Sequence, residues 1–204
     1  SLTIPACVSE CSGIRIFGRR IKSLVFSTDV AIIKNINADA IIAVYPFTPQ
    51  PVIPAIISVS DVPVFVGVGG GITTGSRSVR LAIQSEHQGA YGVVLNAPTS
   101  DDVIRQIKKV VDIPVVITVV SAHTDIGSRL EAGADFLNVS GAAATPEIVA
   151  EIRRSFPKVP IIATGGPQRA ILRTIQAGAN AITYTPPSNG VLFARIMNQH
   201  RKAL

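Results

Sequence analysis

Tryptophan is absent from this 204-residue sequence, and aromatic residues make up only 5% of it. Proteins that bind DNA or RNA usually gather lysine and arginine on one face and stack aromatic side chains on the bases. The basic residues here give a net charge of +6, but they are scattered over several predicted helices. We therefore expect no nucleic-acid partner, and the positive charge favours small phosphorylated molecules instead.

Cysteine is scarce, and long apolar runs are missing. Cys7 and Cys11 are the only cysteines. They are too few for a disulfide framework and lack the further ligands of a metal site, so we expect two reduced thiols. No apolar run reaches the ~18 residues that cross a bilayer, and the first residues lack a secretory-signal pattern. These absences predict a cytoplasmic protein with no membrane partner.

The sequence is rich in short apolar runs that alternate with amphipathic segments. Hydrophobic residues make up 47% of the chain, enough for one well-filled core. The alternation is typical of a single-domain (β/α)8 TIM barrel over residues 22–204, whereas a doubly wound open sheet usually has about five or six strands. The runs predict strands at residues 23–27, 40–44, 62–66, 91–95, 115–119, 136–139, 161–163 and 181–184.

Residues 1–21 precede the first predicted strand, and we expect them to form a lead-in or a lid over one end of the barrel, with a short helix near 14–21. The barrel region repeats internally. The segments NADAIIAVYP, AGADFLNVSG and AGANAITYTP introduce the second, sixth and eighth strands. Asp39, Asp135 and Asn180 hold the same place in these repeats, where strands begin, and we assign them to turn formation and stability.

Two predicted strands end in glycine-rich turns. The segment VPIIATGG at 159–166 runs into helix-forming sequence, and VPVFVGVGGG at 62–71 does the same. Glycine lets the backbone approach a ligand closely, and free N–H groups at the start of a helix attract anions. We therefore predict phosphate binding at Gly165 and Gly166, and a second contact at Gly70 and Gly71. A plain strand-to-helix turn is the alternative at both places.

The active site of a (β/α)8 barrel lies at the C-terminal ends of its strands. Lysine is missing from these ends, which argues against Schiff-base chemistry. Convergent zinc ligands are too few as well, so we expect no metal. The polar candidates that remain are Asp29, Tyr45, Asn96, Thr118, His123, Asp125, Asn138, Ser140, Thr164, Tyr184 and Thr185.

Asp29 and Asp125 follow the first and fifth predicted strands within a repeated Thr-Asp pair. Those strands face each other across a barrel, so the two carboxylates could serve as acid and base on a bound substrate, with His123 nearby. An aspartate before a helix is also an ordinary N-cap, and both interpretations stay open. Asn96 and Asn138 end the fourth and sixth strands, where their amides either hydrogen-bond a ligand or form turns.

The ATGG motif at 163–166 and the later block AGANAITYTPP resemble the phosphate-binding (β/α)8 barrel superfamily, and the resemblance spans residues 22–200. In that superfamily the ends of strands seven and eight together hold a phosphate. The resemblance implies a phosphate on Gly165, Gly166, Thr185 and Ser188. The glycine turns and paired aspartates are also similar to the isomerase and cyclase barrels of histidine biosynthesis, which are longer. A looser likeness joins small bacterial barrels labelled hydrolases.

These observations predict an enzyme that acts on a small phosphorylated sugar or related metabolite by acid/base proton transfer, as an isomerase, epimerase or lyase. No cofactor is required by any motif. One alternative is a barrel that senses a phosphorylated metabolite and controls a partner, and another is a hydrolase of unknown substrate. A homo-oligomer is compatible with the sequence.

Overall fold

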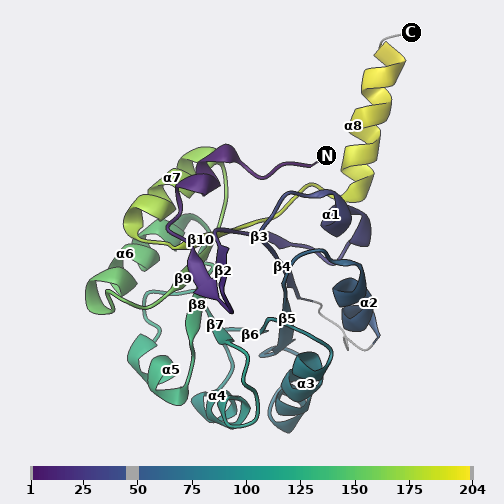
Figure 1. Cartoon of the computed structure of the whole chain (residues 1–204). Helices are drawn as coiled ribbons and strands as arrows, with labels where there is room; N and C mark the ends of the chain where they lie inside the picture. Colours follow the sequence, from purple (N-terminus) through teal and green to yellow (C-terminus); the bar gives the residue numbers. More distant parts are fainter. Residues whose placement is uncertain (1, 45–50, 203–204) are drawn as a thin grey trace.

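The computed structural model describes residues 2–44 and 51–202, so Tyr45 lies outside the described residues. Eight parallel strands form a closed barrel in sequence order, and the last pairs with the first (Figure 1). This arrangement confirms the predicted (β/α)8 barrel. The strands are β3 (Ser23–Phe26), β4 (Ala40–Ala43), β5 (Val64–Gly69), β6 (Gly92–Leu95), β7 (Val115–Val119), β8 (Phe136–Val139), β9 (Ile161–Thr164) and β10 (Ala181–Tyr184).

Helices surround the barrel and join each strand to the next. Asp29, Ser100 and Asp125 start three of them by accepting a backbone hydrogen bond from the first turn. Gly133 and Gly178 end two helices, one of them the helix that Asp125 starts, in the left-handed conformation that glycine favours. The helices are α1 (Val30–Asn35), α2 (Val52–Val59), α3 (Ser76–His87), α4 (Asp101–Lys108), α5 (Ile126–Ala132), α6 (Thr145–Ser155), α7 (Gln168–Ala177) and α8 (Asn189–Lys202), with a 3-10 turn, η2 (Ala142–Ala144), before α6.

Strand side chains alternate between two hydrophobic layers. Outward residues such as Val25 and Ile41 pack against the helices, and inward residues such as Leu24 and Phe65 fill the barrel. Both faces of every strand are therefore covered, so the strands are apolar along nearly their whole length. All five residues of β7 are buried. The continuous apolar runs in the sequence have this physical cause.

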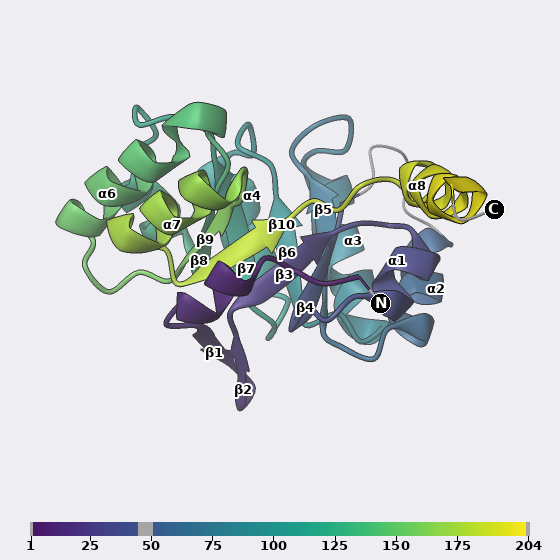
Figure 2. The ribbon, with the colours of Figure 1, turned by 90° about the horizontal axis from the view of Figure 1, so that it is seen from above.

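The N-terminal residues correct one prediction. In place of the helix expected near 14–21, β1 (Ile14–Ile16) and β2 (Arg19–Ile21) form an antiparallel hairpin. Phe17 and Gly18, both at positive φ, make its two-residue turn. The isoleucines of both strands are buried against the barrel interior. Alternating isoleucine and arginine thus produce a strand pair, which lies at the end of the barrel where the strands begin (Figure 2).

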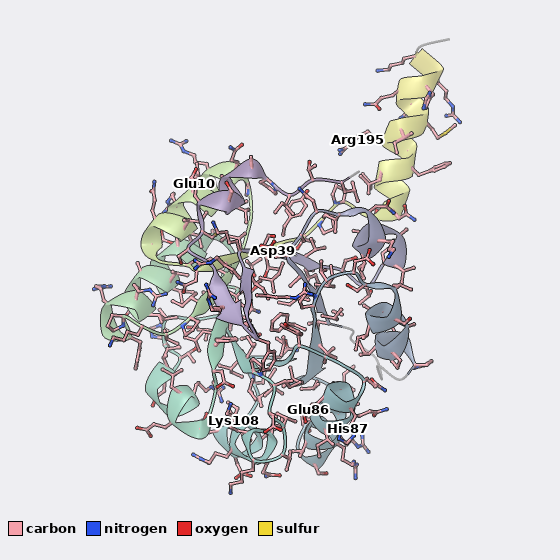
Figure 3. All side chains as sticks on the ribbon, viewed as in Figure 1. Glu10, Asp39, Glu86, His87, Lys108 and Arg195 are labelled. Carbon is pink, nitrogen blue, oxygen red and sulfur yellow. The ribbon has the colours of Figure 1, made fainter. Side chains whose placement is uncertain are left out.

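Turn residues at this end have the role that the sequence predicted. Asp39 accepts an N–H hydrogen bond from the first residue of β3, Asp135 from the first residue of β7, and Asn180 from the first residue of β9. Each precedes one strand and fastens the start of its neighbour, which explains their repetition. Lys108 forms a 2.7 Å ion pair with Asp135; Lys108 and Asp39 are labelled in Figure 3.

The segment before the hairpin lies beside the barrel, between α7 and α1 (Figure 1). Its 3-10 helix, η1 (Ala6–Glu10), contacts α7, and Leu2 pairs with Ile36 just after α1. Cys7 and Cys11 are buried there as free thiols, as predicted. Burial raises the pKa of the Cys11 thiol to about 11, although nearby Lys22 opposes the shift. The thiol therefore stays protonated and unreactive at neutral pH.

Candidate functional site

A cavity of about 310 Å³, here called the mouth cavity, opens at the C-terminal ends of the barrel strands. Its lining combines hydroxyl and amide side chains with a few apolar ones, and among residues 2–44 and 51–202 none that lines it is ionisable. From these residues a ligand meets hydrogen-bonding groups and no charged side chain. The lining consists of Phe26, Ile42, Val44, Val94, Asn96, Thr118, Asn138, Ser140, Thr164, Thr183 and Thr185.

Strand register brings the polar lining together. Thr118 of β7 is paired with Asn138 of β8, and Thr164 of β9 with Thr183 of β10. The Asn138 amide donates a hydrogen bond to the Thr118 hydroxyl at 3.3 Å. Within the described part of the chain, Asn138 Oδ1 and Thr183 Oγ1 are buried without a hydrogen-bond partner. Because a buried polar atom is costly to leave unpaired, both oxygens suit hydrogen-bonding groups of a ligand.

The sequence located part of this lining. Asn96, Asn138 and Thr185 were predicted to bind substrate or phosphate, and all three line the mouth cavity. Thr183 was not predicted, although it lies one residue before the end of its strand, as Thr118 and Asn138 do in theirs. Side-chain alternation along β10 could have found it, since Thr183 shares the inward face of Ala181.

The predicted acid and base residues lie at the same end of the barrel but outside the cavity lining. Asp29 accepts hydrogen bonds from the N–H groups of Ala31 and Ile32 at the start of α1. Asp125 accepts from the Ser128 N–H and lines a separate cavity of about 240 Å³ between α5 and α6. His123 is exposed in the loop before α5. Both carboxylates therefore act as N-caps, and their catalytic role stays a prediction.

The glycine turn after β9 differs in part from the prediction. The Gly165 N–H is not free, because it donates a 2.8 Å hydrogen bond to the Thr183 carbonyl. A Cβ on Gly165 would lie only 3.1 Å from Ile182, so close packing explains this glycine. Gly166 is exposed, and a Cβ there would have its nearest neighbour, Ala170, at 3.7 Å. Of the two glycines, Gly166 has the more open surroundings, and its predicted phosphate contact stays a prediction.

The glycine turn after β5 has an evident structural role. Gly70 is buried, and its N–H donates to the Thr73 carbonyl, while the Asn96 N–H donates to the Gly69 carbonyl. Gly71 is exposed. Neither Gly70 nor Gly71 lines the mouth cavity. Packing therefore explains Gly70 but not Gly71, and the phosphate contact of this turn stays a prediction.

Two further candidates lie away from the mouth cavity. Tyr184 is half-buried and packs into the outer layer against the helices. The Ser188 hydroxyl accepts a hydrogen bond from the Val191 N–H at 3.3 Å, at the start of α8. Ser188 is otherwise exposed, beside the segment that follows Thr185.

Arg129 of α5 holds the loop that carries Asn96, a role that no motif in the sequence indicates. Its guanidinium donates to the carbonyls of Ala97 and Thr99 and forms a 2.9 Å ion pair with Asp101. Burial would raise the pKa of Asp101, but hydrogen bonds from Ser128 and Arg129 outweigh it and lower that pKa. The loop beside the cavity is thereby fixed to α5.

Among the described residues, neither a cluster of metal ligands nor a helix that could span a membrane is present. Over residues 2–44 and 51–202, no group of three His, Cys, Asp or Glu side chains is arranged to hold a metal ion. No helix within those ranges is both long and apolar enough to span a bilayer.

No family model matches the chain, and no curated protein matches its sequence. Solved structures share its fold. A protein assigned as a phosphonomutase from Burkholderia cenocepacia J2315 has a TM-score of 0.65 and 16% identity, over 89% of this chain and 92% of that one. Phosphonopyruvate hydrolase, solved with oxalate and Mg²⁺, has a TM-score of 0.66 and 15% identity, over 89% of this chain and 80% of that one. Mandelate oxidase has a TM-score of 0.65 and 16% identity, over 86% of this chain and 68% of that one. Such low identities show the fold alone: the chain is a (β/α)8 barrel.

Proposed function

We propose that this chain binds a small phosphorylated metabolite at the mouth cavity and acts on it by proton transfer, as an isomerase, epimerase or lyase. The supporting observation is a cavity whose described lining residues are uncharged and include hydrogen-bonding side chains, beside a glycine turn that precedes a helix. A volume of about 310 Å³ suits a small molecule. The hydroxyl and carbonyl groups of the metabolite would hydrogen-bond to Asn138 and Thr183 in the cavity. The phosphate would lie outside the cavity, where the chain leaves β9.

The start of α7 supports the phosphate position. This helix has ten residues and no side-chain cap at its first turn. Its first intrahelical donors are Ala170 and Ile171, so the N–H groups of Gln168 and Arg169 precede the hydrogen-bonded turns. Free amides and the helix dipole favour an anion there. Thr185, just after β10, lines the mouth cavity together with Thr164 at the end of β9 and supplies a hydroxyl.

The phosphate position predicts a specific loss in one variant. A Gly166→Asp substitution places a carboxylate where the phosphate is proposed to bind, and the open surroundings of Gly166 allow the fold to persist. We expect phosphorylated sugars to raise the melting temperature of the native protein and to leave that of the variant unchanged. A thermal-shift series with each sugar and its phosphate measures this.

Gly71→Asp is the matched control, because Gly71 is also exposed and a Cβ there meets nothing closer than 3.8 Å. It adds the same charge at the same end of the barrel. Because the proposal places the phosphate at the turn after β9 and not at Gly71, this variant should keep the response. Equal loss in both variants would point to general repulsion and remove the turn after β9 from the proposal.

Proton transfer is assigned to two carboxylates at the same end of the barrel, outside the lining of the mouth cavity. Asp29 and Asp125 begin the helices after β3 and β7, which lie on opposite sides of the ring. Since neither lines the cavity, a substrate must extend above it to reach them. The two carboxylates could then serve as acid and base on its opposite faces.

Substitution of Asp29 separates catalysis from capping. Asparagine is as good an N-cap as aspartate, so Asp29→Asn should change the free energy of unfolding by less than ~0.5 kcal/mol. Alanine cannot cap, and Asp29→Ala should cost about 1 kcal/mol. If Asp29 moves a proton, Asp29→Asn lowers turnover by orders of magnitude at nearly unchanged ligand affinity. Full turnover in Asp29→Asn would leave this residue a cap only.

A non-catalytic metabolite sensor is the second candidate, because no described residue that lines the mouth cavity has an ionisable side chain. Incubation with phosphorylated sugars in D₂O distinguishes the two. An enzyme that moves a proton at carbon exchanges it for deuterium, which NMR detects. Thermal stabilisation without exchange, across every sugar that binds, favours the sensor.

A further inference from the structure

The last helix, α8, projects away from the barrel (Figures 1 and 2). None of its 14 residues, Asn189 to Lys202, is buried. Leu192, near its base, packs against the outer core. An isolated helix of ~12–15 residues is only marginally stable in water, and most helices in proteins are stabilised by packing. The helix continues for about three turns beyond Leu192. Packing against a further surface would stabilise these turns.

Helical spacing gathers the apolar side chains of α8 on one face. Leu192, Phe193, Ile196 and Met197 recur at the three- and four-residue intervals that form such a stripe. Phe193 is 66% exposed and Ile196 is 52% exposed. Arg195, labelled in Figure 3, lies on α8 well away from the barrel. The stripe is thus presented to whatever packs on α8 from outside.

Among the described residues, the place where α8 could pack against its own barrel is already occupied. A helix after β10 would return to the ring between α7 and α1, but the N-terminal segment is already there. Its η1 contacts α7, and Leu2 pairs with Ile36 after α1. In a second copy the same place is filled by the same segment, so exchange of α8 between barrels is also blocked. The self-complementary surface that remains is α8 itself.

We propose that α8 helices of two copies pair antiparallel about a two-fold axis, with Phe193 and Ile196 at the centre. The charge pattern supports this geometry. Basic residues occupy the last turn, at His200, Arg201 and Lys202, and the first turn carries no acidic residue. Antiparallel pairing places each basic turn beside the uncharged first turn of the other copy. It holds the two basic turns about 16 Å apart, beyond the ~8 Å screening length at physiological salt.

The area sets the strength of this pair. A phenylalanine with its aliphatic neighbours offers on the order of 300 Å² per copy, well below the ~800 Å² per partner of a standard interface. A two-fold axis doubles every contact, which makes so small a patch usable. The dimer is therefore weak, forms at high protein concentration and dissociates on dilution.

Sedimentation velocity of the full chain over a concentration series tests the proposal. The native mass should rise toward twofold with concentration, whereas Phe193→Glu and Ile196→Glu stay monomeric with unchanged melting temperatures, because both side chains are exposed. Val110, 44% exposed just after α4, gives the matched control, and Val110→Glu should dimerise like the native chain. A native chain that stays monomeric throughout, or equal loss in Val110→Glu, overturns the proposal.

Disulfide trapping tests the orientation. Ile196→Cys should form an intermolecular disulfide under mild oxidation, and Asn198→Cys, on the opposite face of α8, should not. The buried Cys7 and Cys11 do not compete. Equal trapping at both positions contradicts the stripe. Co-sedimentation with vesicles of phosphatidylcholine and phosphatidylserine is the remaining arm: binding by a chain that stays monomeric, lost in Phe193→Glu, overturns the dimer in favour of an anionic membrane.

Discussion

Gly70→Ala is expected to destabilise the barrel by about 3 kcal/mol or more. Gly70 has a φ of +97°, a conformation that alanine adopts only with strain, and it is buried. A Cβ at this position would lie 2.8 Å from the Asn96 backbone nitrogen. That nitrogen cannot retreat freely, because it is hydrogen-bonded to the Gly69 carbonyl at 2.9 Å. Urea unfolding followed by circular dichroism gives the change in free energy.

Gly71→Ala is the control for this prediction. Gly71 is exposed, and a Cβ there meets nothing closer than 3.8 Å. Its unfolding free energy should stay within ~0.5 kcal/mol of the native value, as for other surface positions. Similar losses in both variants would mean that the turn after β5 tolerates neither change for a reason other than contact with Asn96.

Arg153→Ala is expected to cost about 3 kcal/mol, because hydrogen bonds from a charged donor contribute roughly 1.5–3 kcal/mol each and the acceptors left behind are partly buried. The guanidinium ties the end of α6 to the start of β10. Burial lowers its pKa, but it remains charged at neutral pH. Its acceptors are the carbonyls of Phe156, Pro157, Val159 and Gly178 and the side-chain oxygen of Asn180.

Arg154→Ala supplies the comparison, since the neighbouring arginine is exposed and should be replaceable with little effect. Arg153→Lys should recover only part of the loss, because an ammonium group lacks the planar fork that reaches several acceptors at once. Thermal and urea unfolding of the three variants measure the order. Full recovery by lysine would show that charge, and not geometry, carries the contribution.

The barrel was predictable because its strands are covered on both faces. This makes every strand a short apolar run, and helices of regular length separate the runs. The hairpin of β1 and β2 was not predictable in the same way. Its strands have three residues each, too few for an alternating pattern to stand out from a helical one. Only the burial of Ile14, Ile16 and Ile21 inside the barrel decides the matter.

The site was predictable by position more than by role. The rule that strand ends form the site located Asn96, Asn138 and Thr185, because parallel strands bring their C-terminal ends to one rim. Whether an aspartate caps a helix or contacts a substrate depends on the direction of its side chain. The sequence around Asp29 does not show that direction. The hydrogen bond of the Gly165 N–H was not predictable for a similar reason. Its acceptor lies on β10, and only the tertiary structure brings the two groups together.

The hairpin gives the barrel a floor. Because Ile14 and Ile16 pack with Phe65 inside the ring, whatever enters at the rim must leave by that same opening. Substrate entry and product release then use the same opening and cannot occur at the same time. For a chain that converts its ligand, a spent molecule would block the next one until it departs, and inhibition by product should be strictly competitive with substrate.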